Sequence, residues 1–156
     1  MLLYPPGAMR IDASWSPNGP ATRVARTVSP RIGIAATSSS ASPFDLEAKI
    51  VVIEQLVPLF VAGTLGTEGI GILATLFFGP VRIDGERVWG RAARRWGSVQ
   101  LSTGPLLSML AGVEERENAI EPFAGVRLFP SGHGLWEIGV SVRRDGIGLS
   151  VGGALW

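Results

Sequence analysis

The amino-acid sequence predicts an all-β protein whose strands follow one another in an antiparallel up-and-down meander. Residues 123–156 alternate apolar with small or polar residues around short turns, which is the two-residue period of a β-strand. β-Branched and aromatic residues, which favour strands, fill much of the apolar sequence between residues 50 and 78. The chain has 156 residues, of which 46% are hydrophobic and only 17% charged, so we expect one apolar domain, residues 1–156.

Residues 1–42 read as a less regular N-terminal segment that is rich in Pro, Ser, Ala and Arg. The stretches MRIDASW (9–15) and RVARTVSPRIGIAATS (23–38) indicate short strands on either side of a turn-like SPNGP. The segment is basic, because it contains four arginines and only one acidic residue. These are Arg10, Arg23, Arg26 and Arg31, and Asp12. We favour an exposed loop and edge strand here over an anion-binding arm.

Residues 43–81 are the most hydrophobic part of the chain, and two structures compete for them. Ser42-Pro43 followed by Asp45 resembles a helix start, so a helix over 43–62 covering the sheet would give an α+β fold. Pro58 and the glycines that follow it oppose that helix. We favour a hairpin of residues 55–65 and 70–81 around the turn GTEG. A two-helix membrane hairpin over 44–81 is less favoured, because neither half supplies a clean run of roughly 18 apolar residues.

Residues 82–97 contain an Asp84-Gly85 turn signal and then a run of arginines between two tryptophans. Arg91, Arg94 and Arg95 have the chemistry to bind phosphates or lipid head groups, but we favour a solvated loop whose tryptophans cover a nearby edge. SVQLSTG (98–104) and LLSMLAGV (106–113) then indicate further strands. The acidic stretch 114–122 lacks the spacing of a calcium loop and reads as a solvated loop.

The last 22 residues, LWEIGVSVRRDGIGLSVGGALW, predict a hairpin with a two-residue turn at Asp145-Gly146. This register pairs Val142 with Leu149 and Val140 with Val151, and it sorts the side chains onto two faces. One face is apolar and comprises Trp136, Ile138, Val140, Val142, Leu149, Val151 and Leu155. The other is small or polar and carries Glu137, Ser141, Arg143 and Ser150, with Trp156 on this side as well.

The preceding stretch, FAGVRLF, extends the same sheet as a third strand. Pairing Val126 with Ile138 sets Arg127 opposite Glu137, where an ion pair would contribute about 0.2–1 kcal/mol. Residues 123–156 are therefore the best-supported part of the predicted meander.

Two physical solutions satisfy such a pattern. A soluble sheet would bury the apolar face under a helix or a second sheet, which leaves an unprotected terminal strand edge. A transmembrane barrel removes that edge, turns the apolar face to lipid and faces Arg127, Glu137, Ser141, Arg143 and Ser150 inward. We favour the barrel, with a soluble β-rich or α+β interaction module as the alternative.

The last 35 or so residues resemble the C-terminal strands of bacterial outer-membrane β-barrels. The likeness lies in the two-residue alternation, the Gly/Ser-rich inner face and the aromatic last residue, Trp156, which here falls on the small-residue face rather than on the lipid-facing one. It implies a barrel placed in the lipid bilayer of the outer membrane. We expect a small barrel of about eight strands, since ~150 residues can supply that many. Its role would be structural, a small pore or adhesion. The start MLLYPPGAMR does not read as a secretory signal, so this expectation requires a truncated or misassigned start.

The sequence gives no sign of catalysis, and we expect no enzyme, cofactor or metal site. There is no Cys, and the single His133 lies in a Gly-rich turn without the His-x-Ser pair of outer-membrane lipid A deacylases, which the chain resembles in size. A net charge of +1 gives no case for nucleic acid as a partner. Whether the chain binds a small-molecule ligand does not follow from the sequence.

Overall fold

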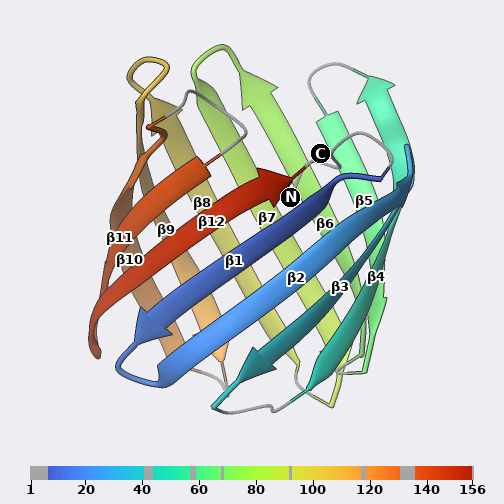
Figure 1. Ribbon diagram of the computed structural model, residues 1–156, viewed down its shortest axis with the longest axis horizontal. Coiled ribbons are helices and arrows are strands. Elements are labelled where there is room, and N and C mark those ends of the chain that lie inside the picture. Colours follow the sequence, from blue (N-terminus) through green and yellow to red (C-terminus); the bar gives the residue numbers. More distant parts are fainter. Residues whose placement is uncertain are drawn as a thin grey trace.

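The computed structural model describes residues 7–40, 44–56, 59–67, 69–91, 93–116, 119–130 and 136–155. These residues form twelve antiparallel strands that close into one barrel (Figure 1). The strands are β1 (Met9–Ser16), β2 (Gly19–Ser29), β3 (Ile32–Ser39), β4 (Asp45–Leu56), β5 (Leu59–Gly66), β6 (Gly69–Phe78), β7 (Val81–Gly90), β8 (Arg94–Ser102), β9 (Leu107–Arg116), β10 (Ala119–Leu128), β11 (Trp136–Arg143) and β12 (Gly146–Leu155).

Each strand pairs with its neighbours in sequence, and β1 pairs with β12 to close the wall. The closing register runs from Met9 opposite Leu155 to Trp15 opposite Leu149, and the two strands lie side by side in Figure 1. The predicted all-β antiparallel meander and its closure are therefore confirmed. The predicted number of about eight strands is wrong, because segments that read as loops in the sequence are strands joined by very short turns.

The helix predicted as an alternative over residues 43–62 is wrong, since β4 and β5 occupy that range. The β4–β5 register shifts between Val51 and Ile53 and again between Ile53 and Leu56. Such irregularities place an extra residue in one strand and break its two-residue alternation, which explains why the segment does not alternate cleanly in sequence. The favoured hairpin is present as β5 and β6, with Gly66 opposite Gly69. Its strands are shorter than predicted, because Gln55 and Leu56 belong to β4 and Val81 begins β7. In the part of the chain that the structure describes, no helix is long and apolar enough to cross a membrane.

The N-terminal segment is more regular than predicted. It forms β1, β2 and β3, and β1 is no edge strand because β12 pairs with its free side. Its arginines divide between the two faces of the wall: Arg10 and Arg23 line the interior, whereas Arg26 is exposed among the outward-facing residues of β2.

The turn predicted at Asp84-Gly85 is also wrong, because both residues lie in the middle of β7. Gly85 is paired with Ala74 on one side and Gly97 on the other, and the Asp84 carboxylate is buried against Thr75. The acidic stretch 114–122 is likewise mostly strand: residues 114–116 end β9 and residues 119–122 begin β10.

The C-terminal hairpin has its turn at Arg144-Asp145, so the predicted register is wrong by two residues. Val140 pairs with Leu149 and Val142 with Ile147. A shift of two preserves the side of the sheet to which each residue points, so the division into two faces is unchanged. The β10–β11 register is shifted in the same way, with Arg127 opposite Gly139, and the predicted pairing of Arg127 with Glu137 is wrong. His133 and Trp156 lie outside the described residues.

The two faces of the wall differ sharply in chemistry. Large hydrophobic side chains are exposed on the outside of the described strands, among them Ile11, Ile72, Val99 and Val126. The largest fully buried side chains are instead polar, namely Thr27, Thr75 and Ser108. This arrangement is the reverse of a water-soluble barrel with an apolar core.

Candidate functional site: a charged barrel lumen

The interior of the barrel encloses a cavity of about 740 Å³. Every second residue of each regular strand points inward, and in this chain many of those residues are charged. The cavity lining includes seven basic side chains and six acidic ones: Arg10, Arg23, Lys49, Arg82, Arg94, Arg127 and Arg143, with Asp12, Glu47, Asp84, Glu86, Glu114 and Glu137. Among the residues that the structure describes, the lining is thus strongly polar but nearly balanced in charge.

Three ion pairs of the lumen join strands that are not adjacent but second neighbours. Arg10 of β1 contacts Glu137 of β11 at 2.7 Å, across β12. Arg23 of β2 contacts Glu47 of β4 at 3.1 Å, across β3. The third pair crosses β10 and joins Arg143 of β11 to Glu114 of β9 at 2.7 Å. Long arginine side chains therefore lie along the inner wall and hold carboxylates two strands away.

The strand that is crossed has to leave room for the pair. On β12 this is the role of Gly152, because a Cβ there would collide with the Asp12 carboxylate and lie 2.6 Å from the Arg10 guanidinium. Arg10 also contacts Asp12 at 2.7 Å, so it holds two carboxylates over the same glycine. At this pair, the glycine on the crossed strand is thus part of the electrostatic arrangement. Under the Arg143–Glu114 pair the crossed strand β10 instead presents the Phe123 ring.

Further charges are fixed along β7 and β8. The Trp96 indole donates a hydrogen bond of 2.7 Å to Glu86, and Arg94 lies 4.0 Å from the same carboxylate. Thr75 donates to Asp84 at 2.6 Å, and Arg82 contacts that carboxylate at 2.8 Å. These contacts explain why the charged residues of β7 are held in the wall and do not form the predicted solvated loop.

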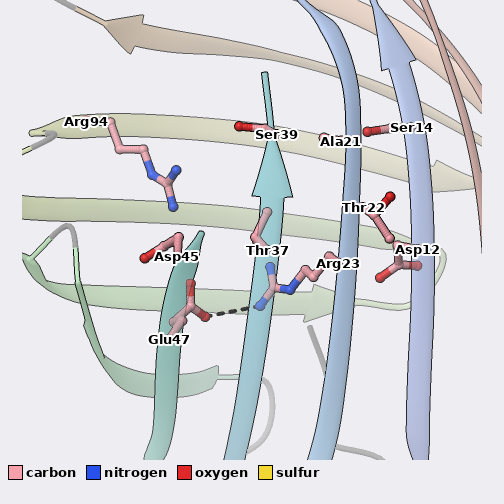
Figure 2. A pocket seen from close by; sticks show the side chains of 10 residues that line it. All are labelled: Asp12, Ser14, Ala21, Thr22, Arg23, Thr37, Ser39, Asp45, Glu47 and Arg94. Atoms are coloured by element: carbon pink, nitrogen blue, oxygen red, sulfur yellow. Dashed lines mark hydrogen bonds and ion pairs between the residues drawn. The ribbon is translucent and has the colours of Figure 1, made fainter. Parts of the chain in front are cut away.

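A smaller recess of about 330 Å³ opens on the β1–β4 side of the lumen. Figure 2 shows Arg23 reaching towards Glu47, with Thr37 of β3 between their strands and Asp45 beside Glu47. Arg94 extends into the same recess from β8. Lys49 also contacts Glu47, at 3.6 Å, so this one carboxylate serves two cations.

The residues predicted to face the lumen occupy inward positions. Arg127, Glu137, Arg143 and Ser150 line the main cavity, and Ser141 is half-buried beside Gly148. Arg143 also lies over the Phe123 ring, at 5.3 Å from its centroid. Arg127 makes no ion pair with the residues that the structure describes, which distinguishes it from Arg143.

The residues predicted to face lipid are all exposed. Their exposed fractions range from 44% to 55%, and they are Trp136, Ile138, Val140, Val142, Leu149, Val151 and Leu155. Two of them, Trp136 and Val151, also border the cavity of about 740 Å³. The Trp136 ring packs over Gly153, which occupies an outward position on β12.

Sequence reasoning missed most of the lumen, including Asp12, Glu47, Lys49, Asp84, Glu86 and Glu114. The signal was present in VRIDGERVWG, where Arg82, Asp84 and Glu86 alternate with outward residues in the same two-residue period as the C-terminal hairpin. This alternation was misread because the dipeptide Asp84-Gly85 has the composition of a turn. In the described part of the chain, no three acidic or histidine side chains are grouped so as to hold a metal ion.

Comparison with known proteins supports the barrel at the level of fold. No protein-family model matches the chain, and no curated protein does so either. A solved KdgM porin is similar to it with a TM-score of 0.65 and 8% sequence identity, over 96% of this chain and 98% of the porin. A KdgM porin in complex with disordered oligogalacturonate is similar with a TM-score of 0.65 and 7% identity, over the same shares of the two chains. The chain therefore has the fold of a porin-type outer-membrane β-barrel.

Proposed function

We propose that this chain is a bacterial outer-membrane barrel that passes small hydrophilic solutes through its lumen. The observation that carries the proposal is the pairing of a charged, 740 Å³ interior with an apolar exterior. In a bilayer, an outward apolar band meets lipid and an inward polar face holds water. The adhesion role is less favoured, because most connections between the described strands are only two or three residues long and offer little surface for a partner.

The outer surface argues for lipid over water. On β11 and β12, eight large hydrophobic residues are exposed, namely the seven predicted to face lipid and Ile147. They form one continuous apolar sheet surface on neighbouring strands. Monomeric soluble proteins rarely expose apolar patches of this kind. A soluble β-rich module would have to cover this surface with another chain.

The lumen favours solutes with little net charge. Of the residues that the structure describes, seven basic and six acidic side chains line the cavity, and most of these arginines already hold carboxylates of the wall. The KdgM porin complex contains oligogalacturonate, whose sugar units carry carboxylates. A nearly balanced lining gives a polyanion no comparable net attraction. We therefore propose neutral or zwitterionic small molecules as the solutes of this barrel.

Reconstitution tests the proposal directly. The protein refolded in detergent should migrate differently on gels with and without boiling, and it should open conducting pores in planar bilayers. In liposome-swelling assays, small neutral sugars should enter faster than acidic sugars of the same size. A folded, monodisperse protein in plain buffer would contradict the membrane placement, and a barrel that inserts without conducting would leave a structural role.

A further inference from the structure

The basic and aromatic run of residues 87–96 is divided between the two sides of the wall. On β8, Arg94 and Trp96 point into the lumen, whereas Arg95 is exposed on the outside. On β7, Arg87 and Trp89 are exposed on the outside. The run therefore supplies two separate groups of side chains, and only the inward group belongs to the lumen described above.

The outward group contains two arginines in direct opposition. Arg87 and Arg95 are Cα partners in the β7–β8 register, and both side chains are exposed. The Arg87 guanidinium lies over the Trp89 ring, 5.1 Å from its centroid. Glu115 of β9, the next outward residue in this row, is ion-paired with Arg95. The one carboxylate in this row is thus held by Arg95, while Arg87 contacts the Trp89 ring. Arg91 adds a third exposed cation in the turn after β7.

This row lies at the end of the apolar outer band. Going along the β7–β8 pair, Val81 faces Leu101, Ile83 faces Val99 and Gly85 faces Gly97 before the two arginines meet. Trp89, one outward position further along, is 45% exposed. Outward tryptophans at the end of an apolar band are typical of the level of the lipid head groups. This placement rests on the proposed membrane location of the barrel.

Like charges directly opposite one another on a sheet are destabilising unless an anion lies between them. The guanidinium group is suited to that anion when it is a phosphate, because it donates two parallel hydrogen bonds to phosphate oxygens. Indole and guanidinium side chains are both favoured at the membrane interface. A phosphate seated on Arg87 and Arg95 would offset the excess positive charge of the row.

The geometry points to a lipid phosphate site on the outer wall, formed by Arg87 and Arg95 with Trp89 beside them. Its ligand is the phosphate of a membrane lipid whose chains lie along the apolar band of β7 and β8. Arg26 of β2 provides the contrast within the same molecule. It is also an exposed outward arginine, but its Cα partners are Met9 and Ile34, so no second cation faces it.

Native mass spectrometry of the folded protein in a phosphate-free maltoside detergent tests the site. The protein is titrated with phosphatidylglycerol, with lipid A, and with diacylglycerol as the lipid without phosphate. Wild type and the control Arg26→Gln should bind the two phosphate lipids in preference to diacylglycerol. The double variant Arg87→Gln/Arg95→Gln should lose about tenfold or more in their affinity, the loss expected from one charge-assisted pair. Equal binding by the double variant would overturn the inference.

Thermal midpoints in the same detergent give a second readout that does not depend on lipid counting. Without lipid, the midpoint of the double variant should stay close to that of wild type. The opposition of Arg87 and Arg95 is gone, but so are the Arg95–Glu115 ion pair and the Arg87–Trp89 contact. Addition of phosphatidylglycerol should raise the thermal midpoint of wild type more than that of the double variant. If inorganic phosphate raises the thermal midpoint as much as phosphatidylglycerol does, the site binds free phosphate and the inference of a lipid ligand is overturned. Both arginines lie outside the lumen, so the double variant should conduct like wild type. If wild type itself does not conduct, the proposed pore is contradicted, but the lipid site is not.

Discussion

The arginines of the inner wall and those of the outer wall meet different surroundings. Inside, Arg10, Arg23 and Arg143 each contact a carboxylate of the barrel itself, two strands away. Outside, Arg87 and Arg95 face one another, and the single carboxylate in their row, Glu115, pairs with Arg95. These arginines of the inner wall are therefore neutralised by carboxylates of the barrel, while this row of the outer wall keeps an excess of positive charge towards the surrounding medium. The side of a strand on which a charge falls decides what the charge can do.

The largest effect is expected when a charge is moved from one side of the wall to the other. Val140→Arg places a guanidinium on the outer face of β11, where burial in lipid should lower the free energy of unfolding by about 2–4 kcal/mol near the bilayer midplane. Ser141→Arg, one residue along, points the same group into the lumen and should cost less. Denaturant unfolding in phospholipid vesicles measures both variants. Equal costs would contradict the assignment of the two faces.

The next effect concerns the space that the crossed strand provides. Gly152→Ala should lower the free energy of unfolding by about 1–3 kcal/mol, because the new methyl group meets the Asp12 carboxylate and the Arg10 guanidinium. Gly63→Ala is the matched control, since the nearest atom to its new Cβ is a backbone oxygen 4.0 Å away. The same unfolding experiment compares the two. If Gly63→Ala lowers the free energy of unfolding as much as Gly152→Ala does, Gly152 is not needed to make room for the ion pair.

Removing an inner carboxylate should change ion selectivity more than stability. Glu114→Gln leaves the Arg143 guanidinium without its charge partner and should shift the reversal potential in a salt gradient towards anions. The accompanying loss of stability should be about 1 kcal/mol. Glu115→Gln is the control on the neighbouring residue, because Glu115 lies outside and pairs with Arg95. A similar shift in both variants would show that the selectivity does not arise in the lumen.

The smallest effect on stability is expected at Arg127. This residue lines the cavity but makes no ion pair among the described residues, so Arg127→Gln removes no partner from a carboxylate. The free energy of unfolding should change by no more than about 0.5 kcal/mol, while the reversal potential should shift towards cations, opposite to Glu114→Gln. Bilayer recordings of the two variants side by side check the signs. A shift in the same direction would contradict the proposed lumen.

The strength of the sequence prediction differed between the C-terminal hairpin and the middle of the chain, for a physical reason. In residues 136–155 the strands alternate cleanly, so the direction of Val140 and Ser141 followed from the two-residue period alone. The register did not follow, because a two-residue shift conserves that alternation, and the position of the turn at Arg144-Asp145 depends on local contacts. One of these is the bond from the Asn18 amide to the Asp145 carboxylate, which joins turns 127 residues apart.

In the middle of the chain, local turn signals outweighed the alternation. Asp84-Gly85 has the composition of a turn, yet its carboxylate is held by Thr75 of β6, a contact that exists only once β6 and β7 are paired. The irregular β4–β5 register likewise hid a strand in a segment with helical start signals. The ion pairs that cross a strand were beyond sequence reasoning, because they depend on the closed order of the strands and on no motif.

Closure of the wall between β1 and β12 also sets the order in which the barrel can assemble. Every other strand pair joins neighbours in sequence, so it forms from a hairpin with a short loop. The β1–β12 pair instead joins Met9 to Leu155, and the Arg10–Glu137 contact spans the same junction. Contacts of such long sequence separation form slowly. We expect a curved, open sheet of hairpins to form first and the junction to close last, so substitutions at Arg10 or Gly152 should slow folding less than they speed opening.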